Sequence, residues 1–140
     1  SRYILVEFSP GDDFQYILNA VRKLQMSRYS VIIAHIERYN CLRADLSNVE
    51  YLREMGAYLQ VNAGSITGSY GRSVKKFLRE ALKEHLVQLV GTDAHGPEKR
   101  TPKMQDAYKE VVKRCGEEYA DQIFGKNAKK VLRNEEIDEY

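Results

Sequence analysis

Tryptophan is absent from this 140-residue chain, and cysteine, proline and histidine are scarce, with two, three and three copies. The two cysteines, Cys41 and Cys115, lie too far apart for a metal-binding Cys-x-x-Cys motif and are too few for a disulfide framework. We interpret them as reduced thiols of a cytoplasmic protein. The chain also lacks a Cys-x5-Arg phosphatase loop and a nucleotide-binding P-loop. Neither of these phosphate-binding devices is therefore available to it.

Long apolar runs and long runs of one charge are also missing. No apolar stretch approaches the roughly 20 residues of a membrane-spanning helix, so we predict no membrane span. Lys and Arg number 22 against 20 Asp and Glu, which gives a net charge of +2. The basic pairs Lys75-Lys76 and Lys129-Lys130 are isolated and favour solvated helix faces over a nucleic-acid patch. We therefore predict no nucleic-acid partner.

What the chain does contain is a regular alternation of short apolar runs and helical spacings. Strands are expected at 3–8, 31–34, 58–62 and 86–90. Helices are expected around 14–24, 46–55, 74–82 and 104–112, with short helices near 123–124 and 131–132 and a polar loop over 64–71. Strands that alternate with helices of this length predict βαβ units and a parallel sheet, so the fold class is α/β.

The chain opens almost directly on the first of these strands, at Tyr3, with only Ser1 and Arg2 before it. We therefore expect it to begin inside a larger fold. Four strands are too few to close a barrel of alternating strands and helices, which typically needs about eight. We predict either the later part of such a barrel or a small open sheet, within a single domain over residues 1–140.

Candidate metal ligands follow three of the expected strands. Glu7 ends the first strand, His35 ends the second, and Asp93 and His95 follow the fourth. If Asp93 and His95 lie on an extended chain, their side chains share a face. A mixture of carboxylate and imidazole suits Mn, Fe or Zn better than Ca. Singly, an ion-paired Glu7, a core His35 and a loop-capping Asp93 are the simpler interpretations, but together the four positions favour a metal site.

Polar residues near these ligands suggest an anionic substrate. Arg38 follows His35 by three positions and Arg100 follows His95 by five, and guanidinium groups match phosphate geometry. Surface salt bridges explain the two arginines about equally well. Asn62 ends the third strand and is a candidate to bind substrate or a ligand imidazole, although a simple turn is the plainer interpretation.

Two further positions near the predicted ligands invite an interpretation. Glu37 is out of phase with His35, so we interpret it as a supporting or surface residue. Tyr39 and Tyr70 are candidates to line the mouth of the site.

Four motifs, taken in this order and spacing, carry a resemblance to a known family. They are Tyr3-Ile4-Leu5-Val6-Glu7-Phe8, Ile33-Ala34-His35-Ile36-Glu37-Arg38-Tyr39, Gln60-Val61-Asn62-Ala63-Gly64-Ser65 and Gly91-Thr92-Asp93-Ala94-His95. The chain resembles the C-terminal part of a bacterial tyrosine-protein phosphatase of the PHP (polymerase and histidinol phosphatase) superfamily. These are manganese-dependent enzymes of capsule and exopolysaccharide biosynthesis. The resemblance covers nearly the whole chain.

The resemblance implies a distorted, TIM-like PHP barrel of parallel strands, with a multinuclear centre of divalent ions, Mn foremost and Fe or Zn as substitutes. Glu7, His35, Asp93 and His95 would be metal ligands. Arg38 and Arg100 would bind the phosphate and stabilise its transition state while a metal-bound hydroxide attacks phosphorus. The substrate would be a phosphotyrosine protein, especially the Tyr-rich tail of a bacterial tyrosine kinase that controls polysaccharide export.

Departures from the family pattern keep two alternatives open. The family's N-terminal His-x-His strand has no counterpart here, and its Asn-Pro signature appears as Asn127-Ala128. The resemblance therefore implies a barrel whose N-terminal strands are missing. One alternative is a PHP phosphatase for a small phosphate ester such as histidinol phosphate. The other is a non-catalytic, degenerate PHP module, which would oligomerise to cover the missing strands.

Overall fold

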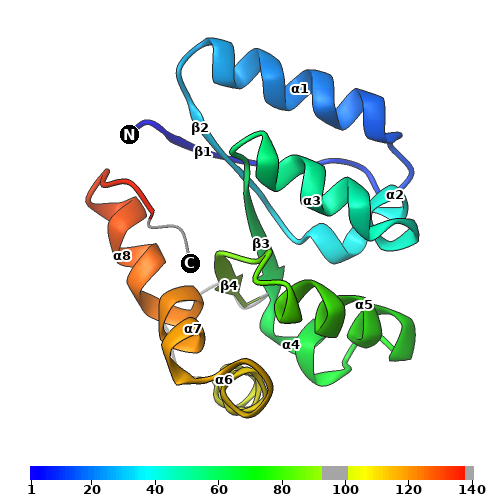
Figure 1. Cartoon of the computed structure of the whole chain (residues 1–140), viewed down its shortest axis with the longest axis vertical. Helices are drawn as coiled ribbons and strands as arrows, with labels where there is room; N and C mark the ends of the chain where they lie inside the picture. Colours follow the sequence, from blue (N-terminus) through cyan, green and yellow to red (C-terminus); the bar gives the residue numbers. More distant parts are fainter. Residues whose placement is uncertain (93–100, 138–140) are drawn as a thin grey trace.

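The structure is a computed structural model that describes residues 1–92 and 101–137. Four parallel strands form its centre. The strands are β1 (Tyr3–Val6), β2 (Ser30–Ile33), β3 (Tyr58–Asn62) and β4 (Leu89–Gly91), and they lie side by side in chain order. All three pairings are parallel, so the α/β prediction is confirmed. Within the described residues the sheet has β1 and β4 at its edges (Figure 1).

Helices follow each strand along the described chain. They are α1 (Phe14–Met26), η1 (Ile36–Arg38), α2 (Asn40–Ala44), α3 (Leu46–Glu54), α4 (Ala63–Thr67), α5 (Arg72–Lys83), α6 (Pro102–Cys115), α7 (Glu117–Asp121), the π-helical η2 (Gln122–Lys126) and α8 (Asn127–Leu132). None of them is long and apolar enough to cross a membrane.

The predicted polar loop over 64–71 is wrong in its first half, where α4 forms. Four of its five residues are buried beneath neighbouring elements, and Gly68 ends it with a φ of 104°. That left-handed conformation is one that glycine adopts without steric cost. Burial, rather than the weak helix preference of Gly64 and Ser65, therefore decides the local structure.

Three helices begin after an Asp or Thr residue whose side chain caps the helix. Asp13 caps α1, where its side chain accepts a hydrogen bond of 2.8 Å from the Tyr16 amide. Asp45 caps α3 in the same way through Ser47. Thr101 caps α6, with Pro102 in the first turn, a position that needs no amide proton. Each cap satisfies a backbone donor that the helix itself leaves unpaired.

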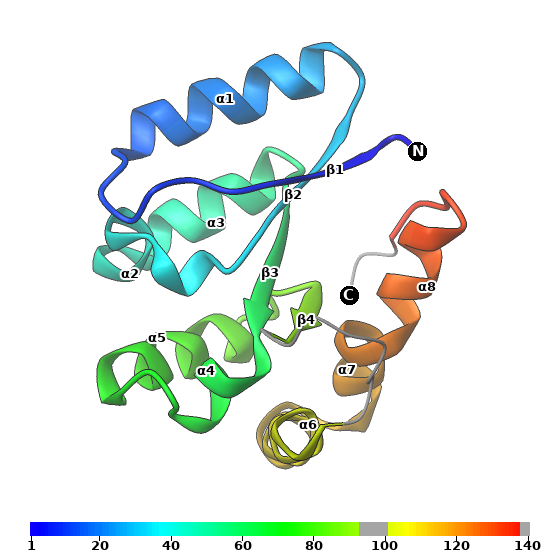
Figure 2. The same ribbon diagram turned by 180° about the vertical axis from the view of Figure 1, so that it is seen from behind.

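The sheet is covered on both faces at β2. Val31 and Ile33 point into the main core beneath the helices, whereas Ile32, between them, joins a smaller cluster with Tyr58, Leu89 and Ile137. Side chains alternate between the faces of a strand, so an unbroken apolar run requires cover on both. The C-terminal segment supplies part of this cover, and it lies beside the N-terminus in both views (Figures 1 and 2).

The two ends of the described chain are joined by hydrogen bonds. The Arg2 amide donates to Asn134 over 2.9 Å, and the Tyr3 hydroxyl donates to the Glu135 carbonyl over 2.6 Å. The Ile137 amide donates in turn to the Tyr3 hydroxyl. The segment after α8 is therefore fixed beside the start of β1. The candidate site lies at the other end of the sheet, where the carboxyl ends of the strands meet.

Candidate functional site

Glu7 and His35 meet where β1 and β2 end. The strand register pairs Val6 with Ile33, so the residues that follow lie at the same edge. There His35 Nε2 lies 3.0 Å from Glu7 Oε1. The structure thus brings together two of the four predicted metal ligands, although they are 28 positions apart in the chain.

The backbone of His35 is in an uncommon conformation. Its φ of 37° and ψ of 61° lie in the left-handed region, which non-glycine residues adopt rarely and at a cost of about 1–3 kcal/mol. This conformation breaks β2 and starts η1. Strain of this kind concentrates at functional sites, where the surrounding structure holds a side chain in one direction. Here the strained residue directs its imidazole at a carboxylate.

Tyr39 holds this corner together, and it does not line the mouth of the site as predicted. Its side chain is fully buried. The hydroxyl donates to the Ala34 carbonyl over 2.8 Å and accepts from the Phe8 amide over 3.1 Å, which ties the end of β2 to the chain after β1. Burial raises the pKa of Tyr39, so the hydroxyl keeps its proton at neutral pH.

The same hydroxyl fixes the direction of the His35 ring. Its oxygen lies 3.2 Å from His35 Nδ1. Because the hydroxyl proton points at Ala34, we assign a proton to Nδ1, which donates to Tyr39. Metal-binding histidines use this arrangement, in which one nitrogen donates to a neighbouring group and the other keeps a lone pair for the metal. In His35 that other nitrogen is Nε2, which faces Glu7.

The pair formed by Glu7 and His35 fits a divalent cation. With Nδ1 protonated, His35 Nε2 and Glu7 Oε1 are both acceptors, so only a proton or a cation between them makes their 3.0 Å separation favourable. The donor set, one imidazole nitrogen and one carboxylate, suits Mn, Fe or Zn. Among the described residues no group of three or more potential ligands gathers.

Arg38, the last residue of η1, is exposed. It lies on the same short turn as His35, three residues further on. The predicted metal ligands Asp93 and His95 and the predicted phosphate-binding Arg100 lie outside the described residues. Strand β4 does end at the same edge, because its register pairs Gly91 with Asn62.

Glu37 is buried, which corrects its interpretation as a possible surface residue. Only 3% of it is exposed, and Oε2 accepts a hydrogen bond of 3.0 Å from the Asn62 amide. The carboxylate therefore connects η1 to the end of β3. The sequence left a supporting and a surface role open for Glu37, because nothing in the string Ile36-Glu37-Arg38 distinguishes a buried acid from a solvated one.

Three buried polar atoms of η1, β3 and α4 have no hydrogen-bond partner within the described part of the chain. Glu37 Oε1, Asn62 Nδ2 and Ser65 Oγ are all buried without a hydrogen-bond partner there. Buried polar groups are normally paired, and each exception calls for an explanation. Asn62, predicted to contact substrate, thus lies at the expected strand end with an amide nitrogen free to donate.

Comparisons with known proteins identify the family of this chain. A family model described as "Capsular polysaccharide synthesis, CpsB/CapC" matches residues 1–133. The tyrosine-protein phosphatase CpsB of Streptococcus agalactiae is 33% identical over 98% of this chain and 58% of its own. The tyrosine-protein phosphatase YwqE of Bacillus subtilis is 32% identical over 98% of this chain and 54% of its own.

A solved structure has a similar fold. It comes from work on YwqE of Bacillus subtilis and CpsB of Streptococcus pneumoniae, described as unique metal-dependent tyrosine phosphatases. The TM-score is 0.86 and the identity 32%, over 99% of this chain and 56% of that one.

Fold and site together define a parallel α/β protein with a candidate metal site at the carboxyl edge of its sheet. The chain belongs to the CpsB/CapC family of capsular polysaccharide synthesis. It spans about half the length of the curated relatives it matches.

Proposed function

We propose that this chain is part of a metal-dependent protein-tyrosine phosphatase, a phosphoric monoester hydrolase that regulates capsular or exopolysaccharide synthesis. The observation that carries the proposal is the pair formed by Glu7 and His35, oriented by Tyr39 at the edge where the strands end. The relatives named tyrosine-protein phosphatases support this activity over hydrolysis of a small ester such as histidinol phosphate.

In this proposal Glu7 and His35 hold a divalent ion, together with Asp93 and His95 from the chain after β4. Manganese is the proposed metal, in a multinuclear centre. When bound, such ions activate water and polarise phosphoryl oxygens. The contribution of this chain is to present a carboxylate beside a nitrogen lone pair, and Tyr39 secures that arrangement by accepting a hydrogen bond from Nδ1–H.

The arginines supply the charge that a phosphate ester requires. Arg38, exposed beside His35, would bind the phosphoryl oxygens of phosphotyrosine and stabilise the charge that develops on them in the transition state. Arg100 is proposed to do the same from the chain after β4. Asn62, with its buried amide nitrogen, would hydrogen-bond substrate or a ligand.

The larger setting is also part of the proposal. Residues 1–140 would be the C-terminal portion of one PHP domain, whose strands β1–β4 continue a TIM-like barrel. The substrate would be a cytoplasmic phosphotyrosine protein, with the Tyr-rich tail of a bacterial tyrosine kinase as the foremost candidate. The name of the family, capsular polysaccharide synthesis, supports this setting.

Metal binding tests the site without requiring activity. We expect Mn²⁺ titrated into this chain by calorimetry to bind, and His35→Ala to weaken or abolish that binding because it removes the only imidazole of the described pair. His85→Ala is the matched control, because His85 lies elsewhere, stacked on Tyr119. Equal Mn²⁺ affinity in the wild type and in His35→Ala would remove His35 from the ligand set.

A further inference from the structure

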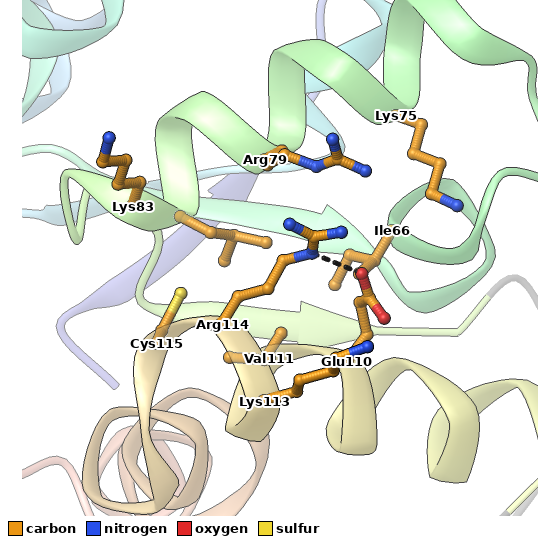
Figure 3. Close-up of a pocket in the computed structure, with 10 residues that line it drawn as sticks. Ile66, Lys75, Arg79, Lys83, Glu110, Val111, Lys113, Arg114 and Cys115 are labelled. Carbon is orange, nitrogen blue, oxygen red and sulfur yellow. Dashed lines mark hydrogen bonds and ion pairs between the residues drawn. The ribbon is translucent and has the colours of Figure 1, made fainter.

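A basic groove lies between α5 and α6, away from the pair formed by Glu7 and His35. The cavity measures about 480 Å³, a volume within the usual range for ligand sites. Figure 3 shows α5 on one side and α6 on the other, with Arg114 of α6 reaching toward α5 across the space between them. Its lining consists of Ile66, Lys75, Arg79, Leu82, Lys83, Glu110, Val111, Lys113, Arg114 and Cys115.

Positive charge is concentrated in this groove. Its lining contains five cationic side chains and one carboxylate, a net charge of +4, whereas the whole chain carries only +2. The carboxylate of Glu110 is already engaged, because it accepts a hydrogen bond from Arg114. That bond lowers the pKa of Glu110, and the nearby charges of Lys75 and Lys113 act in the same direction. Within the described part of the chain no acidic side chain pairs with Lys75, Arg79, Lys83 or Lys113.

The cations form a line rather than a point. Lys75, Arg79 and Lys83 are spaced four residues apart on α5 and so occupy one face of the helix over about 12 Å. On the α6 side the groove has Lys113 and Arg114, and the buried side chains of Ile66 and Val111 lie beneath the charged ones. A groove lined by exposed cations is complementary to an extended acidic segment. A length of about 12 Å accommodates roughly four residues of extended chain.

The groove also points toward the edge that bears the candidate site. In Figure 3 the strands point toward the end of the groove where Lys75 and Ile66 lie. Ile66 belongs to α4, which begins directly after Asn62, the last residue of β3. A chain leaving the carboxyl edge of the sheet can therefore continue along the groove between α5 and α6.

We propose that this groove is a docking site for an acidic segment of the substrate protein, adjoining the phosphotyrosine in its sequence. This inference rests on the proposed function for the identity of the substrate, but not for the binding itself. The groove would increase the affinity for the substrate protein and discriminate among phosphotyrosine proteins, without contacting the reacting phosphate. Electrostatic complementarity of this kind favours specificity and rapid association.

Direct binding tests the groove independently of catalysis. The probe is a fluorescein-labelled, unphosphorylated peptide with Glu and Asp alternating with Leu and Tyr, followed by anisotropy with this 140-residue chain. We expect the double variant Arg79→Glu/Lys113→Glu to weaken binding at least 10-fold. The double variant Lys76→Glu/Lys109→Glu changes the net charge equally on the same two helices, outside the groove, and is expected to bind like the wild type. Circular dichroism verifies that each variant is folded.

Equal loss of binding in both double variants, or no binding by the wild type, would overturn the docking proposal. If inorganic tripolyphosphate binds and the peptide does not, the groove is a small-anion site and the proposal is again wrong. Hydrolysis then separates the two claims. If a phosphotyrosine peptide with an acidic flank is hydrolysed, Arg79→Glu/Lys113→Glu should raise its KM and leave turnover of free phosphotyrosine unchanged. Absence of all hydrolysis by a chain extended to the length of its relatives, with intact peptide binding, would contradict the proposed function alone.

Discussion

At the scale of single residues, the arrangement around His35 depends on one phenol. Tyr39 is four positions from His35 and contacts its ring, the Ala34 carbonyl and the Phe8 amide through one hydroxyl. A strained His35 backbone without this support would be free to relax. The strand-end positions of Glu7 and His35 are visible in the sequence, but the three contacts of Tyr39 depend on the fold.

Replacing that hydroxyl gives a specific prediction. We expect Tyr39→Phe to lower the free energy of unfolding by about 1–3 kcal/mol, since the Phe8 amide and the Ala34 carbonyl lose their partner in a largely buried place. Mn²⁺ affinity should fall about 10–100-fold, as is typical when the group behind a metal-binding histidine is removed. Urea unfolding and calorimetric titration measure the two effects.

Tyr29→Phe is the control for this substitution. Tyr29 is exposed and precedes β2, whereas His35 follows that strand. Unchanged Mn²⁺ affinity in Tyr39→Phe, with the stability loss present, would assign Tyr39 a purely structural role.

At the scale of elements, the sequence predicts helix starts well and short buried helices poorly. The Asp13 cap of α1 can be recognised in the sequence, because an acidic residue precedes apolar residues at helical spacing. Helix α4 is not, since Gly64 and Ser65 suggest a loop. Packing against α5 and α6 decides its structure, and such long-range contacts leave no local signal in the sequence. The link from η1 to β3 through Glu37 was hidden for the same reason.

That link is open to a direct test. We expect Glu37→Ala to lower the free energy of unfolding by about 1–3 kcal/mol, because it leaves the buried Asn62 amide without an acceptor. Glu37→Gln keeps an oxygen in place and should cost less. Chemical denaturation of the three proteins measures the difference. If Glu37→Ala is as stable as the wild type, the hydrogen bond to Asn62 does not secure the end of β3.

At the scale of the whole molecule, parallel strands explain why residues distant in sequence share one site. Each βαβ unit returns the chain in the same direction, so the ends of β1, β2 and β3 meet at one edge. This rule made Glu7 and His35 predictable as neighbours. The roles of Asp93, His95 and Arg100 stay predictions, because these residues lie outside the described part of the chain.

The basic groove belongs to the same scale, and the sequence did not reveal it. Lys75 and Lys76 look like an ordinary solvated pair in the sequence. Only the packing of α5 beside α6 separates them, with Lys75 in the groove and Lys76 outside it. The fold thus brings cationic side chains of α5 and α6, which are dispersed in the sequence, together in one groove.

The most direct test of the central claim is Mn²⁺-dependent hydrolysis of a phosphotyrosine peptide by a chain extended to the length of its relatives. The wild type and Arg38→Ala are compared, and the metal content of both is measured. We predict turnover by the wild type and a loss of roughly 10²–10³-fold in Arg38→Ala at unchanged metal content, the effect of removing one electrostatic stabiliser of a transition state. Absence of hydrolysis by the metal-loaded wild type, or equal turnover in both forms, would contradict the account.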